Sequence, residues 1–318
     1  MTVFKDLLYH PIINQVLRSS LKPFVSLLPR TFLFPINGIF TVKGNGVPPF
    51  KMKTNPSNAV TKFLFWGNIE GFEFSSVKIF CEVVKDSKVF FDIGSNIGYY
   101  SLLASSIKHK QIRVFAFEPM PSIYNCLNEN IQLNQFTNIS AHQLALSNEK
   151  GKAIFYAVTN PKFKDFPQLT GDGGLSASHS GNHSKVQFDV TIETLDNFAK
   201  EYLKNETIDL IKLDTEANEH KVLAGAAIVL GEHRPIIQCE ILKNEVEVEL
   251  ENILKPHRYL YYRATDMGLV KVDSFKNNQT AFVDYYLVPE EKAVRIAKFI
   301  HPATKQSIVI TKTFNFIN

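Results

Sequence analysis

The stretch Val89-Phe-Phe-Asp-Ile-Gly-Ser-Asn-Ile-Gly-Tyr-Tyr-Ser101 decides the fold. Its first five residues are apolar except for Asp92, which is typical of a strand covered on both faces. Gly94 and Gly98 follow as a tight turn, and apolar residues then recur at helical spacing as far as Ile107. The stretch therefore predicts a buried strand that turns sharply into a helix.

Strands and helices alternate along the chain after this point. Further apolar runs predict six more strands, and the short connection between the last two indicates that one of them is antiparallel. The pattern predicts an α/β fold with a seven-stranded, mostly parallel sheet and one antiparallel strand. The predicted strands cover residues 89–93, 112–117, 139–146, 208–213, 235–239, 259–262 and 281–288. A glycine-rich segment, residues 168–184, predicts a mobile loop.

Length and composition limit the class of protein. The chain has 318 residues, 45% of them hydrophobic, so it can bury a full core and is not a disordered chain. The formal net charge is only +4 and no dense basic stripe occurs, so we expect no nucleic-acid partner. Cys81, Cys126 and Cys239 are too few and too far apart for a disulfide framework or a zinc site, which favours a reducing, cytoplasmic location.

Acidic residues mark the ends of the first two predicted strands. Asp92 precedes the turn, and Glu118 directly follows the second strand. In open α/β sheets, ligands bind beyond the carboxyl ends of the strands, where a carboxylate can accept hydrogen bonds from ribose hydroxyls. A dinucleotide site needs the spacing G-x-G-x-x-G, but Asn96 stands two residues after Gly94, and Asp92 would repel a pyrophosphate. S-adenosylmethionine carries a cationic sulfonium and no phosphate, so the two acids favour this methyl donor.

Several segments of the chain resemble a known family. The chain resembles FkbM-type S-adenosylmethionine-dependent methyltransferases over roughly residues 40–290. The segments that carry the resemblance are 89–101, 117–121, 130–134, 194–198 and 208–219. The resemblance implies a class I methyltransferase (Rossmann-like) fold, S-adenosylmethionine as cofactor, and O-methylation of a small acceptor such as a saccharide or secondary metabolite. It implies cofactor-binding roles for Asp92, Gly94, Asn96, Gly98 and Glu118. Ala217 departs from the family pattern, which usually has Gly after Asp-x-Glu.

The acceptor side of the site is predicted from a second acidic cluster. A hydroxyl acceptor loses its proton during methyl transfer, which requires a carboxylate or a histidine within about 3 Å. Asp214 and Glu216 follow the fourth strand, and His220 lies at the start of the next helix. We predict Asp214 or Glu216 as the base or the acceptor-orienting group, with His220 as the third candidate. The alternative for Glu216 is that it belongs to the acidic first turn of that helix.

No metal site is predicted, although a divalent metal remains an alternative. Asp214 and Glu240 end adjacent predicted strands, as oxygen ligands of Mg²⁺ would, but only these two carboxylates converge. Two further functions also stay open. A nicotinamide-dependent oxidoreductase is disfavoured by the glycine spacing, and a non-catalytic docking module is disfavoured because both Asp92 and Glu118 are present.

The motifs divide the chain into three parts. We expect an N-terminal extension with an amphipathic helix and β structure over residues 1–80, a methyltransferase domain over 81–290 and a tail over 291–318. Apolar residues recur at steps of three or four over residues 3–28. This segment either packs on its own domain or a second copy, or it contacts a membrane surface peripherally. No stretch reaches the ~18 apolar residues of a transmembrane helix; a homo-oligomer is left open.

Overall fold

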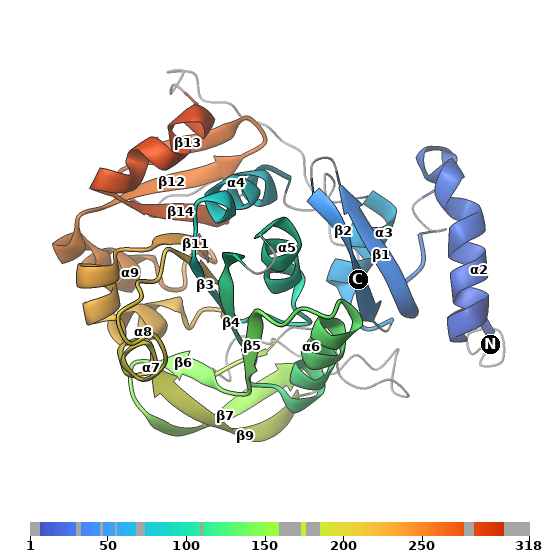
Figure 1. Cartoon of the computed structure of the whole chain (residues 1–318), viewed down its shortest axis with the longest axis horizontal. Coiled ribbons are helices and arrows are strands. Elements are labelled where there is room, and N and C mark those ends of the chain that lie inside the picture. The colour runs from blue at the N-terminus through green and yellow to red at the C-terminus, as the bar shows by residue number, and fades with distance from the viewer. Residues whose placement is uncertain are drawn as a thin grey trace.

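The computed structural model describes residues 7–29, 33–44, 47–54, 56–67, 74–108, 111–158, 173–175, 185–276 and 283–301. Within these residues the main sheet has eight strands in the order β13-β12-β14-β11-β10-β3-β4-β5 (Figure 1). β14 is antiparallel to β11 and β12, and β13 is antiparallel to β12; the five strands from β11 to β5 are parallel. The strands are β3 (Val89–Ile93), β4 (Arg113–Phe117), β5 (Ile139–His142), β10 (Leu210–Leu213), β11 (Ile236–Glu240), β12 (Tyr259–Thr265), β13 (Gly268–Val272) and β14 (Asp284–Pro289).

This order confirms the predicted class I methyltransferase fold and adds detail at two places. All seven predicted strands are present, and β13 is an eighth, antiparallel strand that forms a hairpin with β12. Its five residues include a lysine, so its apolar run is too short to stand out in the sequence. The predicted strand 139–146 is divided: β5 belongs to the main sheet, and β6 (Ala145–Ser147) pairs in a second sheet.

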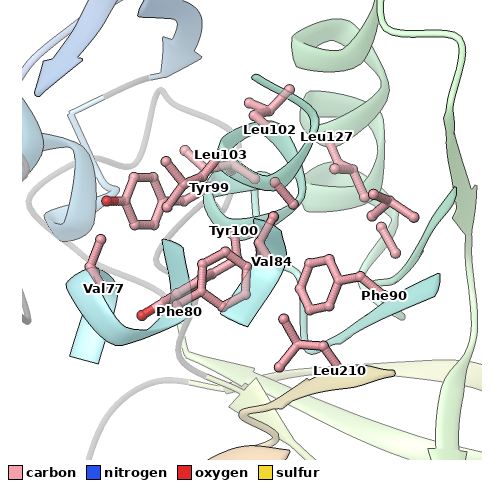
Figure 2. Packing of buried hydrophobic residues seen from close by; sticks show 14 of the residues in the cluster. Val77, Phe80, Val84, Phe90, Tyr99, Tyr100, Leu102, Leu103, Leu127 and Leu210 are labelled. Atoms are coloured by element: carbon pink, nitrogen blue, oxygen red, sulfur yellow. The ribbon is translucent and has the colours of Figure 1, made fainter. Parts of the chain in front are cut away.

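Helices cover both faces of the main sheet because its strands alternate between two apolar clusters. Phe90 of β3 packs in one cluster and Phe91 in the other, since successive side chains of a strand point to opposite faces. One face carries α4 (Phe74–Lys85), α5 (Tyr99–Lys108) and α6 (Pro121–Leu133), and the other carries α7 (Leu195–Tyr202), α8 (Glu219–Ala224) and α9 (Glu247–Leu254) (Figure 1). Figure 2 shows the first cluster, in which Phe80 and Tyr100 pack edge to face.

A second sheet has the order β6-β9-β7-β8 within the described part of the chain. Its long strands are β7 (Gly151–Val158) and β9 (Lys185–Thr194), which pair antiparallel. The short strand β8 (Gly173–Gly174) pairs with β7 and falls within the predicted loop 168–184. The loop's other residues, apart from Leu175, lie outside the described residues.

The N-terminal segment places a hairpin and two helices beside the main domain. Strands β1 (Gly38–Gly44) and β2 (Val47–Thr54) pair antiparallel, and α3 (Ala59–Gly67) follows them. The predicted amphipathic segment contains α2 (Pro11–Leu21) and the 3₁₀ helix η1 (Lys22–Leu27), and α2 stands at the edge of the molecule beside the hairpin (Figure 1).

Two asparagines, one in α6 and one at its C-cap, attach the hairpin to the main domain. Asn130 accepts a hydrogen bond from the Lys53 backbone N–H at 2.6 Å, and Asn134 accepts one from the Lys51 N–H at 2.7 Å. The Asn134 side-chain amide also donates to the Lys51 carbonyl at 2.7 Å. Because these two side chains are four residues apart on one helix face, they pair with alternate residues of β2 as a neighbouring strand would. The three-part division of the chain itself stays a prediction.

The chain after β14 continues as the 3₁₀ helix η9 (Glu290–Phe299), at the start of the predicted tail. Short helical turns, η7 (Val229–His233) and η8 (Lys255–His257), follow α8 and α9. Among the residues described, no helix has the length and apolar character needed to cross a membrane.

Candidate active site

A cavity of about 430 Å³ lies at the carboxyl ends of β3, β4, β10 and β11. The chain runs outward from β3 through β4 to β5 on one side, and returns through β10 to β11 on the other. The cavity is therefore at the topological switch point, where open α/β sheets bind their ligands. It is lined by all of the predicted cofactor residues except Gly98, and also by Asp214, Glu216 and Glu240.

The turn after β3 is possible only with glycine at its first position. Gly94 has a φ of +78°, and a Cβ there would lie 1.7 Å from the carbonyl oxygen of Asp214. The Gly94 N–H donates to the Phe117 carbonyl at 3.1 Å, which ties the turn to the end of β4. Gly98 has a φ of +94° and lies against Leu127 of α6. The two glycines thus let three chain segments meet at one point.

Glu118 is held in place by the turn. One carboxylate oxygen accepts the N–H of Asn96 at 3.0 Å, and the other accepts the N–H of Met120 at 2.9 Å. Burial raises the pKa of Glu118 to about 7. The carboxylate is therefore fixed in direction, and it retains lone pairs to accept further hydrogen bonds from a ligand in the cavity.

Asp92 begins a row of polar side chains that crosses the sheet. It accepts a hydrogen bond from the Ser101 hydroxyl at 2.6 Å, and burial raises its pKa to about 6. In the sheet register Asp92 is next to Lys212, Lys212 is next to Gln238, and Gln238 is next to Tyr286. All four side chains lie on the same sheet face, because register partners share a face.

Lys212 supplies the positive charge at the base of the cavity. Its ammonium lies 3.5 Å from Oδ2 of Asp214 and 3.7 Å from Oδ1 of Asp284, and its side chain is 3% exposed. The same ammonium lies 5.2 Å from the centre of the Tyr100 ring. A lysine buried to this degree is stable when it is paired with carboxylates.

Glu240 lies beside Asp214 at the carboxyl ends of adjacent strands. The charge of Asp214, together with burial, raises the pKa of Glu240 well above its ordinary value, and Glu240 makes a hydrogen bond with Asp214. Two adjacent carboxyl groups disfavour ionisation of both, which is why Glu240 is harder to ionise here. Asp214 is therefore flanked by the Lys212 ammonium on one side and the Glu240 carboxyl on the other.

The backbone after Asp214 takes an unusual path at Ala217, the residue that departs from the pattern of the resembled family. Glu216 and Ala217 have φ values of +53° and +65°, so both lie in the left-handed region. Glycine adopts this region without steric strain, whereas alanine does so at a cost. The segment is thus strained at the place where a glycine is usual, and it still brings Glu216 to the cavity wall.

The predicted acceptor-side residues are not all brought together. Asp214 and Glu216 line the cavity with Asp92 and Glu118, whereas His220, in the first turn of α8, is not among the described residues that line it. Glu219 turns back on its own loop, where one carboxylate oxygen accepts the N–H of Thr215 at 2.7 Å. Burial raises the pKa of Glu219 to about 7.

Metal ligation finds no support in the described residues. None of their His, Cys, Asp and Glu side chains form a group of three or more that could hold a metal ion. Asp214 and Glu240 do lie together, as their strand positions predict, but among the described residues they belong to no group of three or more such side chains.

Three features of the site are not predicted from the sequence. Lys212 and Gln238 are polar residues within buried apolar strands, and that contrast is the signal which could have identified them. Asp284 is likewise a charged residue within the apolar run of the predicted strand 281–288, so the same signal applies to it. The cavity is also lined by Val60 and Phe63 of α3, which only the folded chain brings there.

Comparison with known proteins relates the chain to methyltransferases. The model for the methyltransferase FkbM domain matches residues 92–267. Methyltransferase sdnD of Sordaria araneosa is 30% identical over an alignment of 152 residues that covers 42% of this chain and 58% of that protein. 2-O-methyltransferase NoeI of Sinorhizobium fredii is 27% identical over an alignment of 168 residues that covers 50% of this chain and 68% of that protein.

A further relative is 31-O-demethyl-FK506 methyltransferase FkbM of Streptomyces tacrolimicus. It is 26% identical over an alignment of 159 residues that covers 45% of this chain and 60% of that protein. The chain therefore spans about three fifths of the length of the Sordaria and Streptomyces proteins.

Proposed function

Because the chain belongs to the FkbM methyltransferase family, we propose that it transfers a methyl group from S-adenosylmethionine to a hydroxyl of a small acceptor, a saccharide or secondary metabolite. The observation that carries the proposal is the fixed Glu118 carboxylate beside the Gly94 turn in the switch-point cavity. Two of the relatives bear names that specify O-methylation, 2-O-methyltransferase and 31-O-demethyl-FK506 methyltransferase. A family match to methyltransferases also favours this function over a nicotinamide-dependent oxidoreductase.

The donor set of the cavity fits S-adenosylmethionine. Glu118 is oriented to accept hydrogen bonds from ribose hydroxyls, and the glycine turn lets the backbone approach a ligand closely. Asp92, Asp214 and Glu240 give this end of the cavity an acidic character that suits a cationic sulfonium and an amino group. When bound, S-adenosylmethionine supplies the methyl group and its electrophilic character.

The chain's own residues position the acceptor and take its proton. We assign the proton to the carboxylate of Asp214 or of Glu216, which both line the cavity. Lys212 and Glu240 hold Asp214 in one orientation, because each makes a polar contact with it. Methyl transfer is an in-line displacement, so this fixed geometry supports the reaction through positioning.

Calorimetric titration with S-adenosylmethionine tests the proposal. We expect wild-type protein to bind the cofactor, and Glu118→Gln to weaken binding at least about tenfold, because the neutral amide is a poorer acceptor for two hydroxyls. Glu129→Gln is the matched control, since Glu129 lies on the exposed side of α6 in an ion pair with Lys53. Absence of binding to the wild type would refute the proposed function, and equal binding by both variants would refute the role of Glu118.

A further inference from the structure

Helix α2 is arranged with its polar side inward. Its buried residues are Asn14 and Arg18, although the helix carries several isoleucine, valine and leucine side chains. Asn14 accepts the Asn37 N–H at 3.0 Å and donates to the Pro35 carbonyl at 3.2 Å. Arg18 donates to the carbonyl of Ile39 in β1. Polar contacts to backbone therefore attach α2 to the molecule, and they turn its apolar side to the exterior.

The outward side of α2 and η1 carries five exposed apolar side chains. Ile12 is 68% exposed, Val16 59%, Phe24 56% and Leu27 80%, and Leu17 is exposed as well. A helix on the surface of a soluble domain normally buries such residues, whereas here α2 stands at the molecular edge (Figure 1). Contiguous exposed apolar surface marks a site of interaction with a partner or a membrane. We call these five residues the apolar strip.

The part of the sequence that contains the apolar strip carries Lys and Arg but no acidic residue. From Leu7 to Ile69 the sequence contains no Asp or Glu, but it contains seven Lys and Arg residues. Three of them, Arg18, Lys22 and Lys43, lie close together. Burial is the largest cause of the lowered pKa of Lys22, and the charges of Lys43 and Arg18 lower it further. Among the described residues, no carboxylate forms an ion pair with Arg18, Lys22 or Lys43.

The exposed apolar side chains and the nearby cations together favour one kind of partner for this surface. A second copy seated on the apolar strip through a two-fold axis would bring the same cations against each other, because such an interface uses the same patch twice. An anionic lipid surface offers an apolar phase for the strip and negative headgroups for the cations. We propose that α2 and η1 bind the surface of an anionic membrane, with the apolar strip inserted at the headgroup boundary and the Lys22–Lys43 side facing the headgroups.

Vesicle flotation with the full chain tests this surface. We expect the wild type to float with vesicles of phosphatidylcholine and phosphatidylglycerol, and to bind at least about tenfold more weakly to phosphatidylcholine alone. The variant Ile12→Gln/Val16→Gln/Phe24→Gln should lower binding at least about tenfold, because it removes apolar surface while keeping good helix formers. The control Ile228→Gln/Val248→Gln/Val294→Gln changes equally exposed side chains elsewhere and should float as the wild type does.

The charge contribution is tested separately. The variant Lys22→Gln/Lys43→Gln should weaken flotation with anionic vesicles at low salt, and high salt should remove the difference from the wild type. Equal flotation of the apolar-strip variant and the wild type would overturn the proposal. The proposal would also be overturned if the wild type formed a dimer that did not bind vesicles and that the apolar-strip variant dissociated. The strip would then contact a second copy. Flotation requires neither methyl donor nor acceptor, so its failure leaves the proposed methyl transfer untouched.

Discussion

At the scale of single residues, Asp214 and Glu216 are the two proposed bases, and both share the cavity with the proposed cofactor residues. We expect Asp214→Asn or Glu216→Gln to lower kcat on the order of 100-fold, because the acceptor hydroxyl then loses its proton acceptor. His220→Gln is the control and should retain nearly full activity, since His220 does not line the described cavity. The measurement is formation of S-adenosylhomocysteine with a panel of saccharides. If both carboxylate variants retained activity within tenfold, neither residue would be the base.

Ala217 carries strain that a smaller residue relieves. Its φ of +65° costs about 1 kcal/mol for an L-residue, and glycine removes this strain. Part of the gain is cancelled, because glycine also raises the conformational entropy of the unfolded chain. We expect Ala217→Gly to raise the free energy of unfolding by about 0.5 kcal/mol, and Ala217→Val to lower it by about 1 kcal/mol or more. Urea denaturation followed by circular dichroism measures both. A glycine variant less stable than the wild type would show that packing of the methyl group outweighs the strain.

The sequence indicates some of these residues more readily than others. Asp92, Gly94 and Glu118 follow from a strand, a tight turn and a second strand, and the structure places all three at the cavity. The prediction of a buried strand over 208–213 does not single out Lys212, because it treats the charged side chains in this run as incidental. The left-handed conformation of Ala217 has no local signal, since alanine itself favours a right-handed helix.

At the scale of secondary structure elements, the start of α8 depends on a buried acid. Glu219 is 1% exposed, and burial raises its pKa from the ordinary 4.5 to about 7. Below about pH 4.5 the carboxyl is protonated in both the folded and the unfolded chain. As the pH rises to 7, the unfolded chain ionises first, so this residue's contribution to stability is progressively lost.

Glu219→Gln removes this pH dependence and keeps an oxygen to accept the Thr215 N–H. We expect the variant and the wild type to have similar free energies of unfolding at pH 4.5. Above pH 7 the variant should be more stable, by on the order of 3 kcal/mol. Urea denaturation at a series of pH values gives the difference between the two proteins directly, and a difference that stays constant with pH would contradict the assignment.

The elements themselves follow well from apolar periodicity, but their partners do not. The run 139–146 contains no Gly, Pro, Asn or Asp, yet β5 and β6 belong to different sheets. The strand β13 is short and interrupted by a lysine, so only its pairing with β12 defines it. Sheet membership depends on contacts between residues far apart in sequence, and periodicity within one run carries no information about them.

At the scale of the whole molecule, the N-terminal hairpin and α3 share the apolar cluster of α4, α5 and α6. Trp66 of α3 is the only tryptophan in the chain, and its indole N–H donates to the Phe34 carbonyl at 2.9 Å. Tryptophan fluorescence therefore reports on the N-terminal segment, whereas far-UV circular dichroism reports mainly on the rest.

We expect these two signals to follow one urea transition with the same midpoint, because a shared core unfolds cooperatively. Asn130→Ala should lower both midpoints together. Asn130 forms hydrogen bonds with the Lys53 N–H of the hairpin and with the Ile97 carbonyl of the turn between β3 and α5. A fluorescence transition at lower urea than the dichroism transition would mean that residues 1–80 unfold as a unit of their own.

Helix α3 also sets a distance that matters for delivery of an acceptor. Val60 and Phe63 form part of the cavity wall, and two residues later the Phe65 ring lies 4.3 Å from the Lys22 ammonium at the junction of α2 and η1. Nine residues of helix span roughly 14 Å. One short helix therefore connects the cavity wall to the junction of α2 and η1. On the two proposals made above, a long amphiphilic acceptor, such as a glycan on a lipid carrier, would enter the cavity while its tail stays in the membrane, without diffusing through solvent.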